Sequence, residues 1–269
     1  MGSWRKKASS AAKKLRTASR IMLISIARTV QLRNVKNSYL STSKNELIDL
    51  LKAWVAISIA FAIVLTGLRF NADFFIGIAV AAITVGVGFL LHEFAHKVLA
   101  QHYGCFAEFR SFDTMLLLAI VLSFLGFIFA APGAVMITGQ VTRRENGLIS
   151  VVGPWTNLAL ALAFLGLNVP VPALSLVWTF GFQINTWLAL FNMIPVWLLD
   201  GRKVWMWNKG VWGATVAAAV GLMWVQSPIL FNDKDVQTFL VTITLFLIVY
   251  LIVKAIRKKI HDQRSTERD

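Results

Sequence analysis

The feature that most constrains this chain is a series of long segments without a single charged residue. One of them runs from Phe74 to Leu91, and two more cover residues 114–142 and 147–199. Because about 20 consecutive apolar residues cross a bilayer as a helix, these segments predict a polytopic membrane protein. The composition agrees, since 57% of the residues are hydrophobic and soluble domains have about 45–50% apolar residues.

The runs predict about six transmembrane helices. They are expected near residues 53–68 and 74–100, twice within 147–199, and near 211–230 and 236–253. The run 114–142 is long for one helix and short for two, and Pro132-Gly133 divides it. We expect it to enter and leave on one side, with residues 132–141 as an extended strand or hairpin beside a cavity. A plain helical hairpin is the alternative. The predicted fold class is therefore all-α, with a re-entrant or extended membrane segment near 114–142.

The basic residues predict the orientation. If both termini are cytoplasmic, all of the 27 Lys and Arg residues except Arg69 and Lys234 fall on the cytoplasmic side, as the positive-inside rule requires. The net charge of +14 thus indicates topology and contact with anionic lipid, not nucleic acid. We expect a multi-pass protein of the cell membrane. An organellar membrane is the alternative, because the acid-free first 45 residues also resemble a transit peptide.

Three sections follow from this pattern. Residues 1–50 are predicted to be a basic cytoplasmic amphipathic arm, residues 51–256 a transmembrane domain with its core at about 75–205, and residues 257–269 a charged cytoplasmic tail. The single cysteine, Cys105, excludes an internal disulfide and a CxxC metal site.

One predicted span carries the sequence HEFAH, residues 92–96, which puts three ionisable groups into an apolar helix. Residues four apart share a helix face, so His92 and His96 can donate two imidazole nitrogens to one metal ion. Glu93 lies beside them and can accept a proton from metal-bound water. This is the HExxH arrangement of zinc hydrolases, in which zinc lowers the pKa of its water to about 7. The alternative is a pair of buried histidines bonded to backbone carbonyls.

A tetrahedral zinc site with an open position needs a third protein ligand. Among the 13 acidic residues, Glu93 and Asp200 stand within or at the end of an apolar run. The predicted topology returns Asp200 to the cytoplasmic side, at a depth similar to the end of the histidine helix. Gly201 is expected to let the backbone turn sharply after this ligand. Alternatively, Asp200 pairs with a neighbouring basic residue at the membrane surface.

Three motifs resemble those of the site-2 proteases, the intramembrane zinc metalloproteases. HEFAHKVLAQHYG is similar to the family's HExxH helix, GPWTN at 153–157 to its Gly-Pro-x-x-Asn segment, and NMIPVWLLDG to its Asn-x-x-Pro motif followed by Asp-Gly. The match covers about residues 75–205. The resemblance implies that His92, His96 and Asp200 bind one Zn²⁺ and that Glu93 is the general base.

The resemblance also implies roles for residues beside the metal. Asn157 and Asn192 are expected to face the site and hold the scissile peptide or its oxyanion, where one donor is worth about 2.7–4 kcal/mol. Interhelical hydrogen bonds are the alternative for each asparagine. Gly133 and Val135 belong to the segment that resembles the family's membrane-inserted strand region, which is expected to clamp substrate by strand addition.

The sequence therefore predicts an intramembrane zinc endopeptidase that cleaves in or near transmembrane segments, as in regulated intramembrane proteolysis. Its expected partners are a transmembrane protein substrate and membrane lipid, with no nucleic acid and no prediction of oligomeric state. The alternatives are a metal transporter and an inactive protease-like binding protein. A prenyl-protein type of metalloprotease is a further one, although such enzymes complete the site with a glutamate and Glu93 is the one glutamate within a predicted span.

Overall fold

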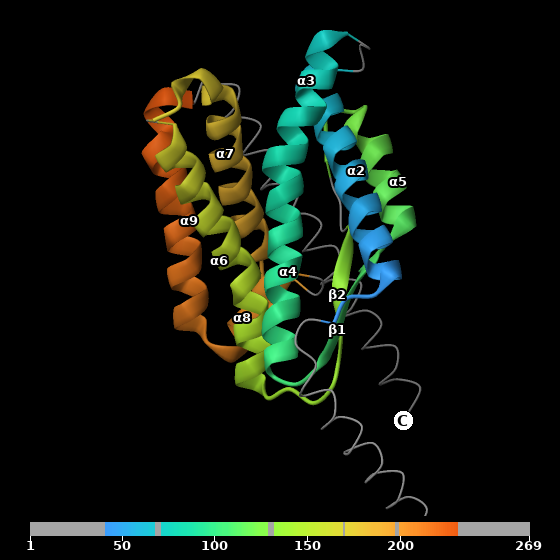
Figure 1. The fold of residues 1–269 in the computed structure, drawn as a ribbon. Coiled ribbons are helices and arrows are strands. Elements are labelled where there is room, and N and C mark those ends of the chain that lie inside the picture. The colour runs from blue at the N-terminus through green and yellow to red at the C-terminus, as the bar shows by residue number, and fades with distance from the viewer. Residues whose placement is uncertain (1–40, 68–70, 129–131, 169, 197–198, 231–269) are drawn as a thin grey trace, which may run out of the picture.

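The structure, a computed structural model, describes residues 41–67, 71–128, 132–168, 170–196 and 199–230 (Figure 1). Within this part, four helical segments are long and apolar enough to cross a membrane: Lys44–Thr66, Ala72–His102, Arg143–Leu167 and Pro172–Asn192. They correspond to four of the predicted spans. Helix α9, Lys209–Leu230, covers a fifth, and the span expected at 236–253 lies outside the described residues. The total of about six spans thus remains a prediction.

The first two of these segments pack side by side. Helix α2, Lys44–Thr66, begins where the Ser43 hydroxyl accepts the backbone N–H of Glu46. The second segment is continuous: α3, Ala72–Ala81, passes through a π-helical turn at Ala82–Gly86 into α4, Val87–His102. At this turn the indole N–H of Trp54 donates to the Ala82 carbonyl, which joins α2 to the long helix.

The second half of the described chain forms a helical group of its own. Helix α6, Arg143–Leu167, begins with a capping box between Thr142 and Glu145. A 3₁₀ turn, Pro172–Leu174, leads into α7, Ser175–Asn192, and α8, Asp200–Trp207, precedes α9. In Figure 1, α6, α7 and α9 stand on one side of α4, while α2 and α5 (Asp113–Ser123) stand on the other.

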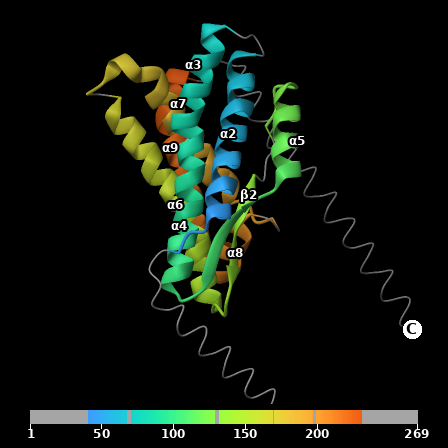
Figure 2. The same cartoon turned by 45° about the vertical axis from the view of Figure 1, so that its right-hand side comes forward.

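A two-stranded antiparallel sheet lies beside the lower half of α4. Strand β1, Phe106–Ser111, pairs with β2, Gly133–Thr138, in a register that places Phe109 opposite Val135. The segment expected to be extended therefore contains a strand and is not a helical hairpin. The turned view in Figure 2 shows the sheet running below α2 and α5. Its position relative to a bilayer remains a prediction.

The fold is thus mostly helical and not entirely so, because β1 was not predicted. This strand begins four residues after α4 ends and contains Glu108 and Arg110, so no apolar run marks it. It forms because β2 offers a partner and because Phe109 and Ala107 are buried against neighbouring elements. The pairing that defines it is non-local and does not show in a short sequence window.

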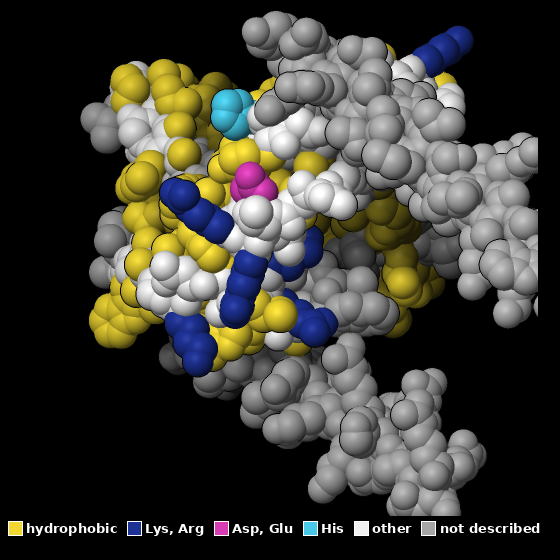
Figure 3. Space-filling model, turned by 90° about the horizontal axis from the view of Figure 1, so that it is seen from below, with side chains coloured by type: hydrophobic (Ala, Val, Ile, Leu, Met, Phe, Trp, Pro, Cys, Tyr) yellow, Lys and Arg dark blue, Asp and Glu magenta, His cyan; other side chains and the backbone are white. Residues whose placement is uncertain are grey.

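Large apolar side chains remain exposed on the outer faces of the helices, which is what lipid contact requires. Leu176 of α7 is 66% exposed, Leu117 of α5 63% and Phe75 of α3 61%. The described Lys and Arg residues, in contrast, gather at one end of the molecule, and the view from below in Figure 3 shows several of them on that face. They are Lys44, Lys52, Lys97, Arg110, Arg143, Arg144, Arg202, Lys203 and Lys209. The chain is therefore a membrane protein with one basic end.

Candidate metal centre

Two histidines of α4 and one aspartate of α8 come together at one point. The Nε2 atoms of His92 and His96 lie 3.0 Å apart. The Oδ2 atom of Asp200 lies 3.3 Å from His92 Nε2 and 3.0 Å from His96 Nε2. Tetrahedral bonds of about 2.0–2.1 Å place donor atoms about 3.3 Å apart. The three side chains, separated by 108 positions of sequence between His92 and Asp200, thus have the spacing of donors to one metal ion.

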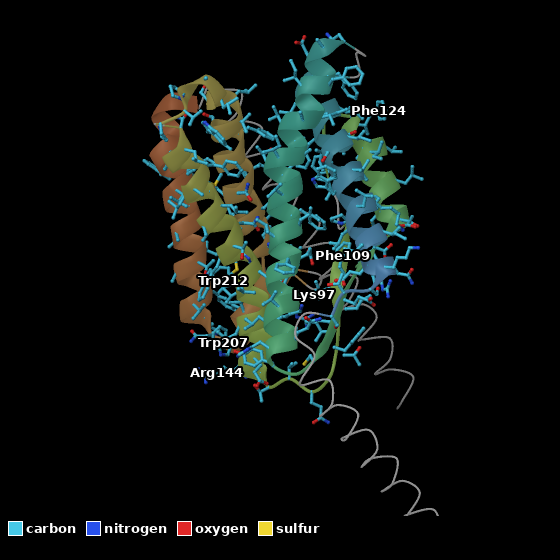
Figure 4. All side chains as sticks on the ribbon, in the orientation of Figure 1. Lys97, Phe109, Phe124, Arg144, Trp207 and Trp212 are labelled. Carbon is cyan, nitrogen blue, oxygen red and sulfur yellow. The ribbon has the colours of Figure 1, made fainter. Side chains whose placement is uncertain are left out.

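Helix α8 brings Asp200 to the histidines, and two close contacts hold this helix in place. Gly201 packs so tightly that a Cβ there would lie 2.1 Å from the Met193 carbonyl oxygen. A Cβ added at Gly147 of α6 would likewise collide with the Trp207 ring. Figure 4 shows Trp207 and Trp212 at the lower end of α8 and α9. Gly201 has no positive φ, so the sharp turn expected of it is wrong: the residue is needed for close approach.

The ring nitrogens that face away from Asp200 are held by oxygen atoms. His92 Nδ1 lies 2.6 Å from Asn157 Oδ1, and His96 Nδ1 lies 2.5 Å from the Ile149 carbonyl oxygen. A carbonyl oxygen can only accept, so each neutral ring carries its proton on Nδ1 and leaves a lone pair on Nε2. Two lone pairs and a carboxylate oxygen then face one another with no proton between them. A bound cation removes the repulsion between these electron pairs. Two imidazole nitrogens and one carboxylate oxygen are a donor set that suits Zn²⁺.

The orientation of the Asn157 amide follows from its other partners. Its Nδ2 donates to the Gly88 carbonyl oxygen at 3.2 Å and to Asn185 Oδ1 at 3.0 Å. Asn185 in turn donates to the Gly181 carbonyl oxygen. Both asparagines are fully buried. Both amide hydrogens of Asn157 are therefore engaged, and its oxygen is directed at His92. Asn185, for which the sequence predicted no role in the site, is the next member of this chain of hydrogen bonds.

Close packing of α6 against the histidines depends on Gly153. A Cβ at this position would lie 2.5 Å from His96 Nε2 and 2.6 Å from His92 Nε2. The Gly-Pro pair of the GPWTN segment thus places the bare backbone of α6 against the metal-binding atoms. Four residues later, the same helix supplies Asn157 to the other side of His92.

A cavity of about 320 Å³ adjoins the metal-binding atoms and has mostly apolar walls. The remaining predicted site residues line it: Glu93, Asn192, Gly133 and Val135. Asn192 donates one amide hydrogen to the Leu188 carbonyl oxygen within its own helix. The Ser150 hydroxyl is buried in the same wall and has no hydrogen-bond partner among the described residues. Asn157, although it also lines the cavity, is occupied with His92.

The free edge of β2 faces this cavity. The N–H of Phe109 points away from β2, because it donates to Glu46 of α2. The Phe109–Val135 pair is therefore a non-hydrogen-bonded pair, in which the backbone groups of Val135 point outward too. The Val135 N–H accordingly approaches the Glu93 carboxylate. By the alternation of the ladder, Gly133 and Ile137 also turn their backbone groups to this side.

The shortest contacts of Asp200 go to the two imidazoles, at 3.0 Å and 3.3 Å. Lys203 is a more distant partner, since its Nζ lies 3.9 Å from Asp200 Oδ1. The expected alternative, a surface ion pair, is thus present as a long contact, while the short contacts of Asp200 go to the histidines.

Comparison with known proteins gives two relatives. A Methanocaldococcus jannaschii protein named "Putative zinc metalloprotease MJ0611" is 39% identical over 186 residues, which is 67% of this chain and 94% of that protein. A Mycolicibacterium smegmatis protein named "Putative zinc metalloprotease Rip2" is 34% identical over 130 residues, or 41% of this chain and 50% of that protein. No family model and no solved structure matches the chain. Both names specify zinc, which is the metal that suits the donor set of His92, His96 and Asp200.

Proposed function

Because the chain belongs to the zinc metalloproteases of the site-2 protease type, we propose that it cleaves peptide bonds in or near the transmembrane segments of other proteins. The observation that carries this proposal is the position of the metal-binding atoms. Those of His92 and His96 lie on a helical segment of membrane-spanning length, and Asp200 joins them from α8. Beside them is a cavity lined also by Glu93 and by residues of β2.

His92, His96 and Asp200 hold one Zn²⁺, and Asn157 and the Ile149 carbonyl fix the two rings in the required tautomer. The bound ion supplies Lewis-acid chemistry, polarising a substrate carbonyl and making a water molecule more acidic. Glu93 accepts the proton of that water as it attacks the peptide carbon. The same carboxyl then donates the proton to the departing amine nitrogen, so that the peptide bond breaks and the base is restored.

The depth of the metal ligands supports cleavage within the membrane. The segment Ala72–His102 has 31 residues, which at about 1.5 Å per residue gives about 46 Å. His92 and His96 then lie about 15 Å and 9 Å from the basic end of this helix. The hydrocarbon core is about 30 Å thick, so a helix with equal overhang extends about 8 Å beyond it on each side. With that overhang, the ligands are expected just inside the core, near its cytoplasmic boundary.

The substrate binds as an extended strand along the outer edge of β2. A transmembrane helix hides its peptide bonds in its own hydrogen bonds, so it must unwind before it can be cleaved. The outward backbone groups at Gly133, Val135 and Ile137 can then replace those bonds. Asn192 keeps one amide hydrogen for the substrate carbonyl or its oxyanion. Asn157 acts instead by positioning His92, because both of its amide hydrogens are engaged.

The orientation follows from the basic end. The described Lys and Arg residues gather where α4 ends and where α2, α6 and α9 begin. Positive residues stay in the cytoplasm, so this end faces the cytoplasm in a multi-pass protein of the cell membrane. With the sixth span that the sequence predicts at 236–253, both termini are expected on that side.

The proposal is tested with purified protein in proteoliposomes that contain a model transmembrane substrate. The wild type is expected to cleave it, with the cut located by mass spectrometry in the cytoplasmic half of the segment. Glu93→Gln is expected to keep zinc and to turn over about 10²–10⁴-fold more slowly, because it has lost the general base. Asp73→Asn is the matched control: it neutralises an exposed carboxylate at the other end of the same helical segment.

Two results would overturn the proposal. One is turnover by Glu93→Gln at the wild-type rate, which would remove Glu93 from the chemistry. The other is zinc uptake into the proteoliposomes by a wild type that cleaves nothing, which would favour a transporter.

A further inference from the structure

A buried ion pair joins α2 to α4 at the outer edge of β1. Glu46 Oε2 lies 2.6 Å from Lys97 Nζ, with the two side chains only 0% and 4% exposed. The other carboxylate oxygen, Oε1, accepts the Phe109 backbone N–H at 3.0 Å. Lys97 also donates to the Thr42 hydroxyl at 2.9 Å. Figure 4 shows Lys97 and Phe109 close together between α4 and the sheet.

Two charges are seldom buried unless their partners are complete, because desolvation is costly. Here the partners come from three separate elements, so the pair does more than join two helices. Glu46 holds the backbone of β1 through Phe109, and Lys97 lies one residue after His96 on α4. The zinc-binding helix and the sheet are therefore connected by one carboxylate.

At one register position, each edge of the sheet faces a glutamate. Phe109 and Val135 are opposite each other, and their N–H groups point in opposite directions. The Phe109 N–H meets Glu46, and the Val135 N–H approaches Glu93. Glu93 and Lys97 are four residues apart and share one face of α4. Glu93 and Glu46 therefore lie on opposite edges of the sheet, and Lys97 connects Glu46 back to α4.

We propose that Glu46, whose buried charge Lys97 compensates, is a positioning residue that sets the distance between the substrate-binding edge of β2 and the Glu93 carboxylate. The inference rests on the proposed function of Glu93 and of β2. Neither Glu46 nor Lys97 lines the metal cavity, although both line a neighbouring pocket that Glu93, Phe109 and Val135 also line. The hydrogen bond from the Phe109 N–H to Glu46 is the contact through which the pair reaches the sheet. The ladder bonds that flank the Phe109–Val135 pair transmit the position of β1 to β2. A shift of about 1 Å in the placement of a substrate can reduce the rate about 100-fold.

The test compares two double variants that both remove the buried charges. E46Q/K97M keeps a side-chain oxygen that can accept the Phe109 N–H, whereas E46L/K97M has none. Neither leaves an unpaired charge, so they differ mainly in the contact to β1. Both are expected to bind zinc as the wild type does. E46Q/K97M is expected to keep kcat within about threefold, and E46L/K97M to lose about 10–100-fold in kcat with little change in KM.

Hydrogen exchange gives a readout that needs no catalysis. Ala134 and Met136 flank Val135, and their N–H groups bond to β1. These amides are expected to exchange faster in E46L/K97M than in E46Q/K97M, with the amides of α6 unchanged. If E46L/K97M does not fold, E46K/K97E replaces it, because the swap restores opposite charges but offers Phe109 no acceptor. A merely structural ion pair predicts recovery by the swap, whereas the positioning role predicts that the loss of kcat persists.

The outcomes separate this inference from the proposed function. A wild type that cleaves nothing refutes the function, while the exchange comparison still decides whether Glu46 orders the sheet. A cleaving wild type with equal kcat and equal exchange in the two double variants overturns the positioning role. Loss of zinc from E46L/K97M alone would also overturn it, because the pair would then be supporting the metal ligands.

Discussion

Substitution of Gly153 by alanine tests the metal site through its sterics and leaves every proposed ligand in place. The added Cβ would lie 2.5 Å and 2.6 Å from the Nε2 atoms of His96 and His92, about 0.8–0.9 Å inside the 3.4 Å at which ordinary contacts begin. Metal–ligand distances tolerate changes of only about 0.2 Å. Either α6 retreats, taking Asn157 away from His92, or the rings turn. We expect zinc affinity to fall about 10–100-fold or more, as it does when ligand support is lost.

The control is the same substitution elsewhere on α6. A Cβ at Gly166 meets no atom within 4 Å, and alanine is the better helix former by about 1 kcal/mol. Gly166→Ala should therefore keep wild-type zinc affinity. The affinities are measured by competition with a chromophoric chelator in detergent, and circular dichroism confirms equal helix content. Wild-type affinity in Gly153→Ala would refute the steric reasoning and the placement of α6 against the ring nitrogens.

Three further predictions follow from the buried contacts. Asn157→Ala removes the acceptor that fixes the His92 tautomer, and zinc affinity measured with the same chelator should fall about 10–100-fold; an unchanged affinity would contradict this role. Lys97→Met leaves Glu46 buried without its partner, so the free energy of unfolding should fall by about 3–5 kcal/mol, whereas E46Q/K97M should recover much of it. Burial raises the pKa of the Cys105 thiol, so alkylation of the folded protein should be slow at pH 7 and accelerate only above the usual thiol range; rapid labelling at pH 7 would show that this thiol is accessible.

The cluster of His92, His96 and Asp200 could be predicted because the signals that mark its members are local. The spacing of His92 and His96 places both rings on one helix face, and Asp200 stands out as a carboxylate at the end of an uncharged run. The structure brings the three together across α4 and α8. The extended segment could also be predicted, because Pro132-Gly133 interrupts a run that is too long for one helix.

Other parts of the site depend on contacts between distant segments, and the sequence alone did not show them. From the sequence, the Asn157 amide could bind either the substrate or a metal-binding histidine. Its hydrogen bonds to Gly88 and Asn185 occupy the amide nitrogen, so that the oxygen faces His92. Gly153 has no room for a side chain because the rings of His92 and His96 on α4 pack against it. Such roles follow from packing, which a pattern of residue types does not specify.

The pair formed by Glu46 and Lys97 was missed for a related reason. Glu46 follows a basic stretch and precedes an apolar run, so it reads as a polar residue at a helix start. Its partner lies 51 positions later and next to a metal ligand. The signal that could have found it is Lys97, the single lysine or arginine in the span 72–102, because a charge there needs a partner.

X-ray absorption at the zinc edge, on protein purified with its metal, tests the central claim most directly. The account predicts one zinc per chain, bound by nitrogen and oxygen at about 2.0–2.2 Å with the scattering pattern of two imidazoles. Asp200→Ala should weaken zinc binding and remove one oxygen from the first shell. A sulfur neighbour at about 2.3 Å, or a zinc environment unchanged by Asp200→Ala, would contradict a site built from His92, His96 and Asp200.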